Sequence, residues 1–206
     1  HRLILEANNN NPNSQFELGR FYYEGVFIQR DIEKAIHYLT LASKNNILFA
    51  NYYLGEIFLY GQYVKKDIYK SAYYLKLAAD QNNKDAQMLL GYIYLTYKDM
   101  KHDINESIYY FKLAANQNQK NAQFFLGLIY SEDEYNMQDI DKAIHYYSLS
   151  AKQNFPDAYF NLFLIYFNIK FNRLDITKAL HNLTLAAKLN HSFAQFTIGC
   201  LYLKGL

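Results

Sequence analysis

The sequence predicts an all-α protein, a right-handed α-solenoid of helix–turn–helix repeats with a period of 36 residues. Three observations predict this fold. The sequence matches itself when it is shifted by 36 residues, its apolar residues recur with helical spacing, and it shows no sustained two-residue alternation. A fixed period in this range indicates stacked repeats that bury their apolar faces against one another. Two of the repeating columns are Asp31, Asp67, Asp103, Asp139 and Asp175, and Asn46, Asn82, Asn118, Asn154 and Asn190.

Each repeat is expected to hold a first helix, helix A, and a second helix, helix B, for example at 50–60 and 68–80. The predicted units are 14–49, 50–85, 86–121, 122–157 and 158–193. Residues 1–13 correspond to the tail of a preceding helix B, and 194–206 to the first helix of a next unit. We therefore expect residues 1–206 to be one repeat array and a fragment of a longer protein.

The recurring polar and small residues have mechanical roles at the ends and centres of these helices. The Asp column precedes each helix B, where a side-chain oxygen can accept from free N–H groups of the first turn. The Asn column follows each helix B, where a left-handed residue commonly ends a helix. A glycine inside a helix costs about 1 kcal/mol relative to alanine. The glycine recurring within helix A therefore predicts a close helix–helix contact; its members are Gly19, Gly55, Gly91, Gly127 and Gly199.

Composition narrows the possible classes of protein. Formal net charge is only +2, with acids and bases interspersed, so no electrostatic footprint for nucleic acid stands out. No apolar run approaches the roughly 18–20 residues that a membrane-spanning helix needs. Cys200 is the single cysteine, which excludes an internal disulfide and favours a reducing, cytoplasmic compartment. The aromatic fraction is high at 18%, with 22 Tyr and 15 Phe.

The repeat resembles the Sel1-like repeat family, which is related to the tetratricopeptide repeats. The second unit shows the pattern in order: Ala50, Leu54-Gly55, a turn Gly61, Asp67, an aromatic pair at 73–74 and Ala78-Ala79. Asn replaces the family's Gly after helix B in every unit. The resemblance implies a scaffold or adaptor that gathers other proteins, and related tetratricopeptide proteins bind peptides in the groove lined by their first helices.

No catalytic, cofactor or metal site is predicted. The motifs Ser-x-x-Lys and His-Glu-x-x-His and a phosphate-binding glycine loop are all absent. His37, His145 and His181 share one repeat column with Tyr73 and Tyr109. Neighbouring packed helices lie about 8–10 Å apart, too far for one metal ion to bind two members of such a column. We interpret this column as half-exposed aromatic residues on helix B.

Four columns of helix A vary most between repeats, and their spacing of i, i+4, i+7 and i+11 places them on one helical face. We expect this face to line the concave side of the solenoid. Exposed apolar stripes and aromatic anchors are typical of binding surfaces. The predicted partner-binding residues are Tyr53, Glu56, Leu89, Tyr92, Phe125, Leu128 and Leu164, with Arg20 and Glu132 joining Glu56 as a polar rim.

Alternatives remain at this point. Some of these side chains could instead pack inside a tightly wound array. The chain could also be a structural spacer attached to a signalling domain, such as a kinase, rather than a binding module. A helical-repeat RNA reader would need a basic groove, which the near-neutral charge and apolar columns disfavour.

Overall fold

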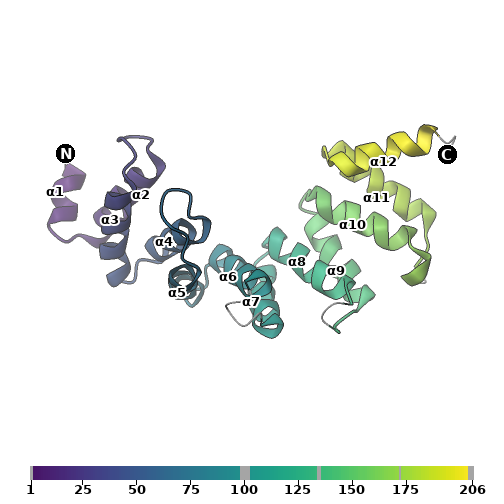
Figure 1. The fold of residues 1–206 in the computed structure, drawn as a ribbon, viewed down its shortest axis with the longest axis horizontal. Helices are drawn as coiled ribbons and strands as arrows, with labels where there is room; N and C mark the ends of the chain where they lie inside the picture. Colours follow the sequence, from purple (N-terminus) through teal and green to yellow (C-terminus); the bar gives the residue numbers. More distant parts are fainter. Residues whose placement is uncertain (1, 98–102, 134–135, 172, 204–206) are drawn as a thin grey trace. The chain divides into compact units, whose positions relative to one another are not determined.

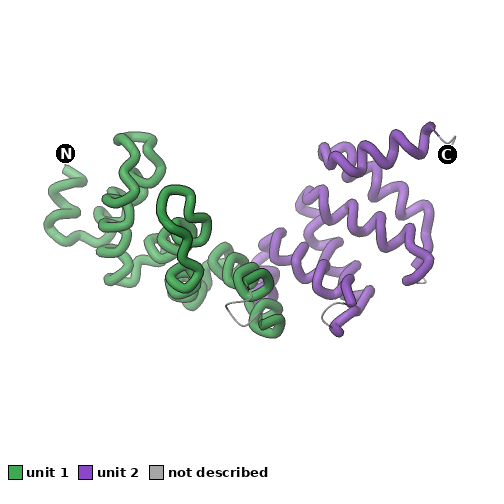
Figure 2. The backbone as a smooth tube through the Cα atoms, in the orientation of Figure 1, with its two compact units in different colours: residues 1–110 green, residues 111–206 purple. Residues whose placement is uncertain are grey.

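The computed structural model describes residues 2–97, 103–133, 136–171 and 173–203, and within them every regular element is helical (Figure 1). The chain divides into two compact units, residues 1–110 and 111–206 (Figure 2). The first unit holds α1 (Arg2–Asn8), α2 (Pro12–Glu24), α3 (Ile32–Lys44), α4 (Leu48–Tyr60), α5 (Ile68–Ala79), α6 (Lys84–Thr96) and the start of α7 (Ile104–Asn116). The second holds the end of α7, α8 (Lys120–Ser131), α9 (Ile140–Ala151), α10 (Pro156–Phe167), the short 3₁₀ helix η2 (Ile169–Phe171), α11 (Ile176–Lys188) and α12 (Ser192–Leu203).

Helices A and B alternate along the chain as the period predicts. The even-numbered helices α2 to α12 are helices A, and the odd-numbered helices α3 to α11 are helices B. Within each unit the buried residues form clusters between successive helices. In the first unit, for example, Leu39 and Ala42 of α3 pack against Ala50, Leu54 and Ile57 of α4.

The recurring glycine of helix A marks where its partner helix B comes closest. A Cβ added at Gly55 would lie 2.5 Å from Cγ of Leu75, and one at Gly127 would lie 2.5 Å from Cδ1 of Tyr147. The prediction that this glycine permits a close contact is therefore confirmed at these positions. In the second and third repeats a serine of helix B strengthens the contact, because Ser71 Oγ donates to the Gly55 carbonyl at 2.8 Å.

The capping predictions for helix B are also confirmed. The side chains of Asp31, Asp67, Asp139 and Asp175 each accept a hydrogen bond from the backbone N–H three residues later. After each helix B, an asparagine adopts the left-handed conformation with φ between 58° and 65°. These residues are Asn46, Asn82, Asn118, Asn154 and Asn190.

Helix A begins two residues earlier than the predicted start at Ala50 and its equivalents. The structure places the N-cap three residues before the alanine column, where Asn83 accepts from Ala86 N and Gln119 accepts from Ala122 N. A second polar column links successive repeats, since Gln87 Nε2 donates to the Ala79 carbonyl of the preceding helix B. A polar residue three positions before the alanine column was the sequence signal for this cap in four helices A, whereas Ile47 and Phe155 stand there without a side-chain cap in the other two.

Helix B carries the exposed aromatic column that its sequence predicts. His37, Tyr73, Tyr109, His145 and His181 are all exposed. The next residue in the first four of these repeats is a tyrosine that stacks on an aromatic ring of helix A, with ring centroids 5.8–6.1 Å apart. In these four repeats each exposed residue of the column is therefore followed by a tyrosine that packs between helices A and B.

Candidate protein-binding site

The predicted partner-binding residues of the first unit lie on α4 and α6, which are successive helices A. Tyr53 and Glu56 of α4 and Tyr92 of α6 are partly exposed. Leu89 of α6 is only 5% exposed and belongs to the packed interior. It shares a column with Tyr53, whose longer side chain ends in a hydroxyl that reaches the preceding helix A. Three of the four predicted residues therefore remain accessible to a partner.

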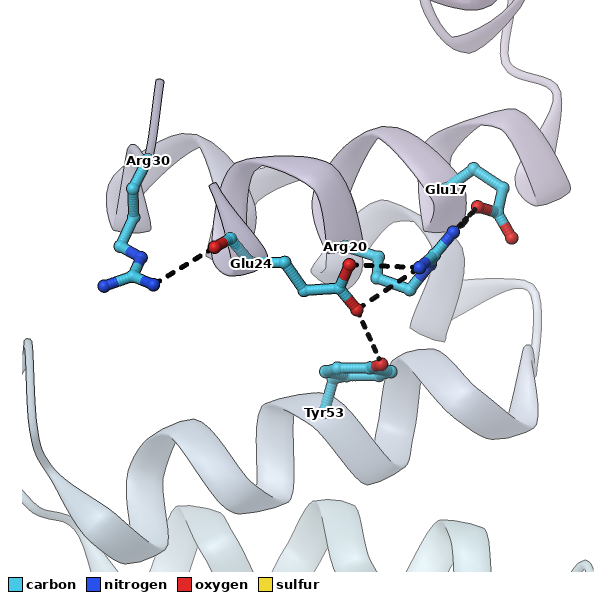
Figure 3. A network of polar contacts seen from close by, with 5 residues as sticks. All are labelled: Glu17, Arg20, Glu24, Arg30 and Tyr53. Carbon is cyan, nitrogen blue, oxygen red and sulfur yellow. Dashed lines mark hydrogen bonds and ion pairs between the residues drawn. The ribbon is translucent and has the colours of Figure 1, made fainter. Parts of the chain in front are cut away.

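A polar network joins α2 to α4 on this face (Figure 3). Arg20 pairs with Glu17 at 2.6 Å and with Glu24 at 3.1 Å, all within α2. The Tyr53 hydroxyl donates to Glu24 Oε1 at 3.2 Å from the next repeat. Burial, reinforced by the Glu24 carboxylate, raises the pKa of Tyr53 to about 12, so its hydroxyl remains a donor at neutral pH. Two successive helices A are thus tied together through a charged centre.

Glu56 occupies a different environment on the same face. Tyr52 donates to its Oε1 at 2.8 Å, one helical turn away. Burial raises the pKa of the Glu56 carboxyl above its ordinary value; the Tyr52 hydrogen bond opposes this shift and the Asp85 carboxylate adds to it. Glu56 in turn raises the pKa of the hydroxyls of Tyr23 and Tyr60, for which burial is the larger cause. A partly desolvated carboxylate therefore lies among tyrosines of α2 and α4.

Two exposed rings on this face were not among the selected site residues. Phe49 is 54% exposed and Tyr60 is 60% exposed, at the two ends of α4. Both belong to the variable columns of helix A, so the variation between repeats was the signal that could have identified them. Phe49 stacks with Phe16 of α2 at 6.2 Å between ring centroids. The exposed rings thus flank Tyr53 and Glu56 along one helix.

In the second unit the three predicted residues differ in their surroundings. Phe125 stacks on Phe111 of α7 with ring centroids 5.1 Å apart, and Leu128 is half-buried. Leu164 is 45% exposed. It lines a pocket of about 590 Å³ whose polar groups come from Asn161, Asn168, Ser131 and the Tyr147 hydroxyl.

The described residues show neither a metal site nor a membrane-spanning helix. No three His, Cys, Asp or Glu side chains there gather in a way that could hold a metal ion. None of the helices within those residues is long and apolar enough to cross a membrane.

A family comparison decides the identity of these repeats. The sequence model of the Sel1 repeat matches residues 12–47, 48–83, 84–119, 120–155 and 156–191. The chain belongs to the Sel1 repeat family. Each match begins two residues before the unit predicted from the sequence, close to the start of helix A. Sel1 repeats are a non-catalytic scaffold, and the proteins that carry them are generally protein-interaction scaffolds.

Solved structures resemble the Sel1 array over nearly its whole length. A Sel1 repeat protein from Oxalobacter formigenes is 30% identical with a TM-score of 0.81, over 95% of this chain and 80% of that one. The protective antigen c5321 of uropathogenic Escherichia coli is 25% identical with a TM-score of 0.87, over 97% of this chain and 43% of that one. A putative Sel1 repeat protein from Klebsiella pneumoniae, 18% identical, shares the fold with a TM-score of 0.59 over 98% of both chains. No curated protein sequence matches the chain.

Proposed function

We propose that this Sel1 array is an interaction scaffold whose helix A faces bind a peptide or protein segment. One observation carries the proposal: on α4 two of the columns that vary between repeats hold exposed rings, whereas the constant alanine column of helix A (Ala50, Ala86, Ala122, Ala158 and Ala194) is fully buried. Phe49 and Tyr60 are more than half exposed, while Leu54 in a constant column is fully buried. Large rings ordered on a rigid helix are typical binding anchors because little side-chain entropy is lost on association.

The charges on the face favour a protein partner over a nucleic acid. In the first unit Arg20 is already paired with Glu17 and Glu24, and Glu56 adds a further carboxylate. Binding of a phosphate backbone depends on unpaired Lys and Arg side chains along the contact. An acidic, aromatic helix face does not offer them.

Two tyrosines of equal exposure allow a matched test. Tyr60 lies on helix A and is 60% exposed, and Tyr73 lies on helix B and is 61% exposed. A natural partner would first be identified by cross-linking to the full-length protein and then purified. We expect Tyr60→Ala to weaken its binding about tenfold or more, as loss of an aromatic anchor does, and Tyr73→Ala to leave binding within about twofold.

The opposite pattern would contradict the proposal. Loss of binding with Tyr73→Ala alone would assign recognition to the helix B face. Unchanged binding with both variants, and with Phe49→Ala, would favour the spacer interpretation, in which the array only holds other domains apart. Circular dichroism of each variant shows whether the helices are intact.

A further inference from the structure

The helix A face of the first unit carries more acid than base. Glu17, Glu24, Glu56 and Asp85 lie on this face or at its edge, together with the cations Arg20 and Arg30. Arg30 donates to the Glu24 carbonyl at 3.1 Å, and its guanidinium lies over the Tyr63 ring. Arg20 is held by Glu17 at 2.6 Å and by Glu24 at 3.1 Å, both within its own helix. The positive charge of Arg20 is therefore compensated within α2 and does not neutralise the Glu56 carboxylate of the next repeat.

Glu56 is the acid on this face whose charge is left uncompensated. Its hydrogen-bond donor is the neutral Tyr52 hydroxyl at 2.8 Å. Among the described residues no lysine, arginine or histidine forms an ion pair with it, and the charge that acts on it most is the like charge of Asp85. A partly buried carboxylate without a cation is costly, and a cation from outside would relieve that cost.

The groups around Glu56 are suited to a cation. The Tyr60 ring is 60% exposed beside it, and the hydroxyls of Tyr23 and Tyr53 lie within its electrostatic influence. Faces of aromatic rings attract ammonium and guanidinium groups, and such contacts strengthen when they are partly desolvated. The tyrosines can therefore surround the carbon stem of a basic side chain while the carboxylate binds its charged end.

We infer that the segment bound by the first unit is basic, and that one of its Lys or Arg side chains pairs with Glu56 among these tyrosines. The inference rests on the proposed function, since it names the chemistry of the partner at the same face. Charge complementarity selects this occupant: an acidic segment would place a like charge beside the Glu56 carboxylate, and a purely apolar one would bury Glu56 without a cation.

Synthetic peptides test the inference with the 206-residue chain itself. One fluorescent peptide of twelve residues alternates Lys and Arg with Gly, Ser and Leu; a second replaces every Lys and Arg with Glu; a third replaces them with Gln. Binding of each is measured by fluorescence anisotropy at low and at physiological ionic strength. The variant Glu56→Gln keeps the size of the side chain and an acceptor for Tyr52 but removes its charge. Glu33→Gln, an exposed acid on α3, makes the same change of net charge away from the face.

The expected result is binding of the basic peptide alone, weakened by salt. Glu56→Gln should weaken that binding about tenfold, the size of a lost charged hydrogen bond, and Glu33→Gln should leave it within about twofold. Equal effects of the two variants would show that the peptide is held by non-specific electrostatic attraction, and this would overturn the inference. Preference for the acidic or the neutral peptide, or no binding of the basic one, would overturn it as well.

The natural partner separates this inference from the proposed function. If Tyr60→Ala weakens binding of the purified partner while Glu56→Gln binds it as the wild type does, the face is the binding site but the basic side chain is not at Glu56. If neither these substitutions nor Phe49→Ala affects binding of the partner, the helix A face of the first unit is not its site, and both this inference and the proposed role of that face are wrong.

Discussion

Gly19→Ala and Gly199→Ala form a matched pair, because the same change at the same repeat position meets opposite surroundings. A Cβ added at Gly19 would lie 2.8 Å from Leu39 Cγ and 2.9 Å from its backbone nitrogen. At Gly199 no heavy atom of the described residues lies within 4 Å, apart from its own helix and chain neighbours. Replacing a mid-helix glycine with alanine favours the helix by about 1 kcal/mol in both cases. At Gly19 alone, overpacking against the buried Leu39 opposes this gain by about 1–3 kcal/mol.

Backbone atoms cannot move aside as a flexible side chain can, so we place the cost at Gly19 near the upper end of that range. Gly19→Ala should then lower the free energy of unfolding by about 1–2 kcal/mol, or the melting temperature by roughly 2–8 °C. Gly199→Ala should raise stability by up to about 1 kcal/mol. Thermal and urea unfolding followed by circular dichroism measures both. Equal stabilisation by the two substitutions would refute the close contact at the glycine column.

Three further predictions concern other recurring positions. Asn118, with φ of 58°, should tolerate Gly, whereas Asn118→Val should lower the free energy of unfolding by about 1–2 kcal/mol in urea titrations. The pKa of Asp175 is lowered from 3.8 by its hydrogen bond from the Lys178 N–H and by the Lys178 side chain, so its contribution to stability is present above 3.8 and is lost as pH falls through the lowered pKa. Asp175→Asn should remove that part of the pH dependence in unfolding curves measured between pH 2 and 5 in about half-unit steps. Ser71→Ala should cost about 0.5–1.5 kcal/mol in thermal unfolding through loss of its bond to the Gly55 carbonyl, and no cost would show that this bond is neutral.

Positions that repeat could be predicted from the sequence because each is fixed by the local backbone. Asp67 caps α5 and Asn82 takes the left-handed conformation for reasons contained within a few residues. The glycine column could be interpreted because its cost within a helix requires a compensating contact, which Gly55 shows. The start of helix A was misplaced because the alanine column is more regular than the capping residue before it.

The exposure of side chains on the helix A face was less predictable because it depends on neighbouring helices. Tyr53 and Leu89 share one column, yet Tyr53 is partly exposed and Leu89 is buried. The longer Tyr53 side chain reaches Glu24 of the preceding helix A. The sequence placed Glu56 on the variable face of helix A, where it is partly exposed. It could not show that Arg20 is held by α2 and leaves Glu56 without a cation, because that depends on side-chain geometry.

Footprinting by hydroxyl radicals tests the central claim most directly, that the helix A face binds a protein segment and the helix B face does not. Tyr60 and Tyr73 are 60% and 61% exposed, so they should be oxidised at similar rates in the free chain. On binding of the purified partner, we predict that oxidation of Tyr60 falls several-fold while that of Tyr73 is unchanged. Protection of Tyr73 with continued oxidation of Tyr60 would contradict the account.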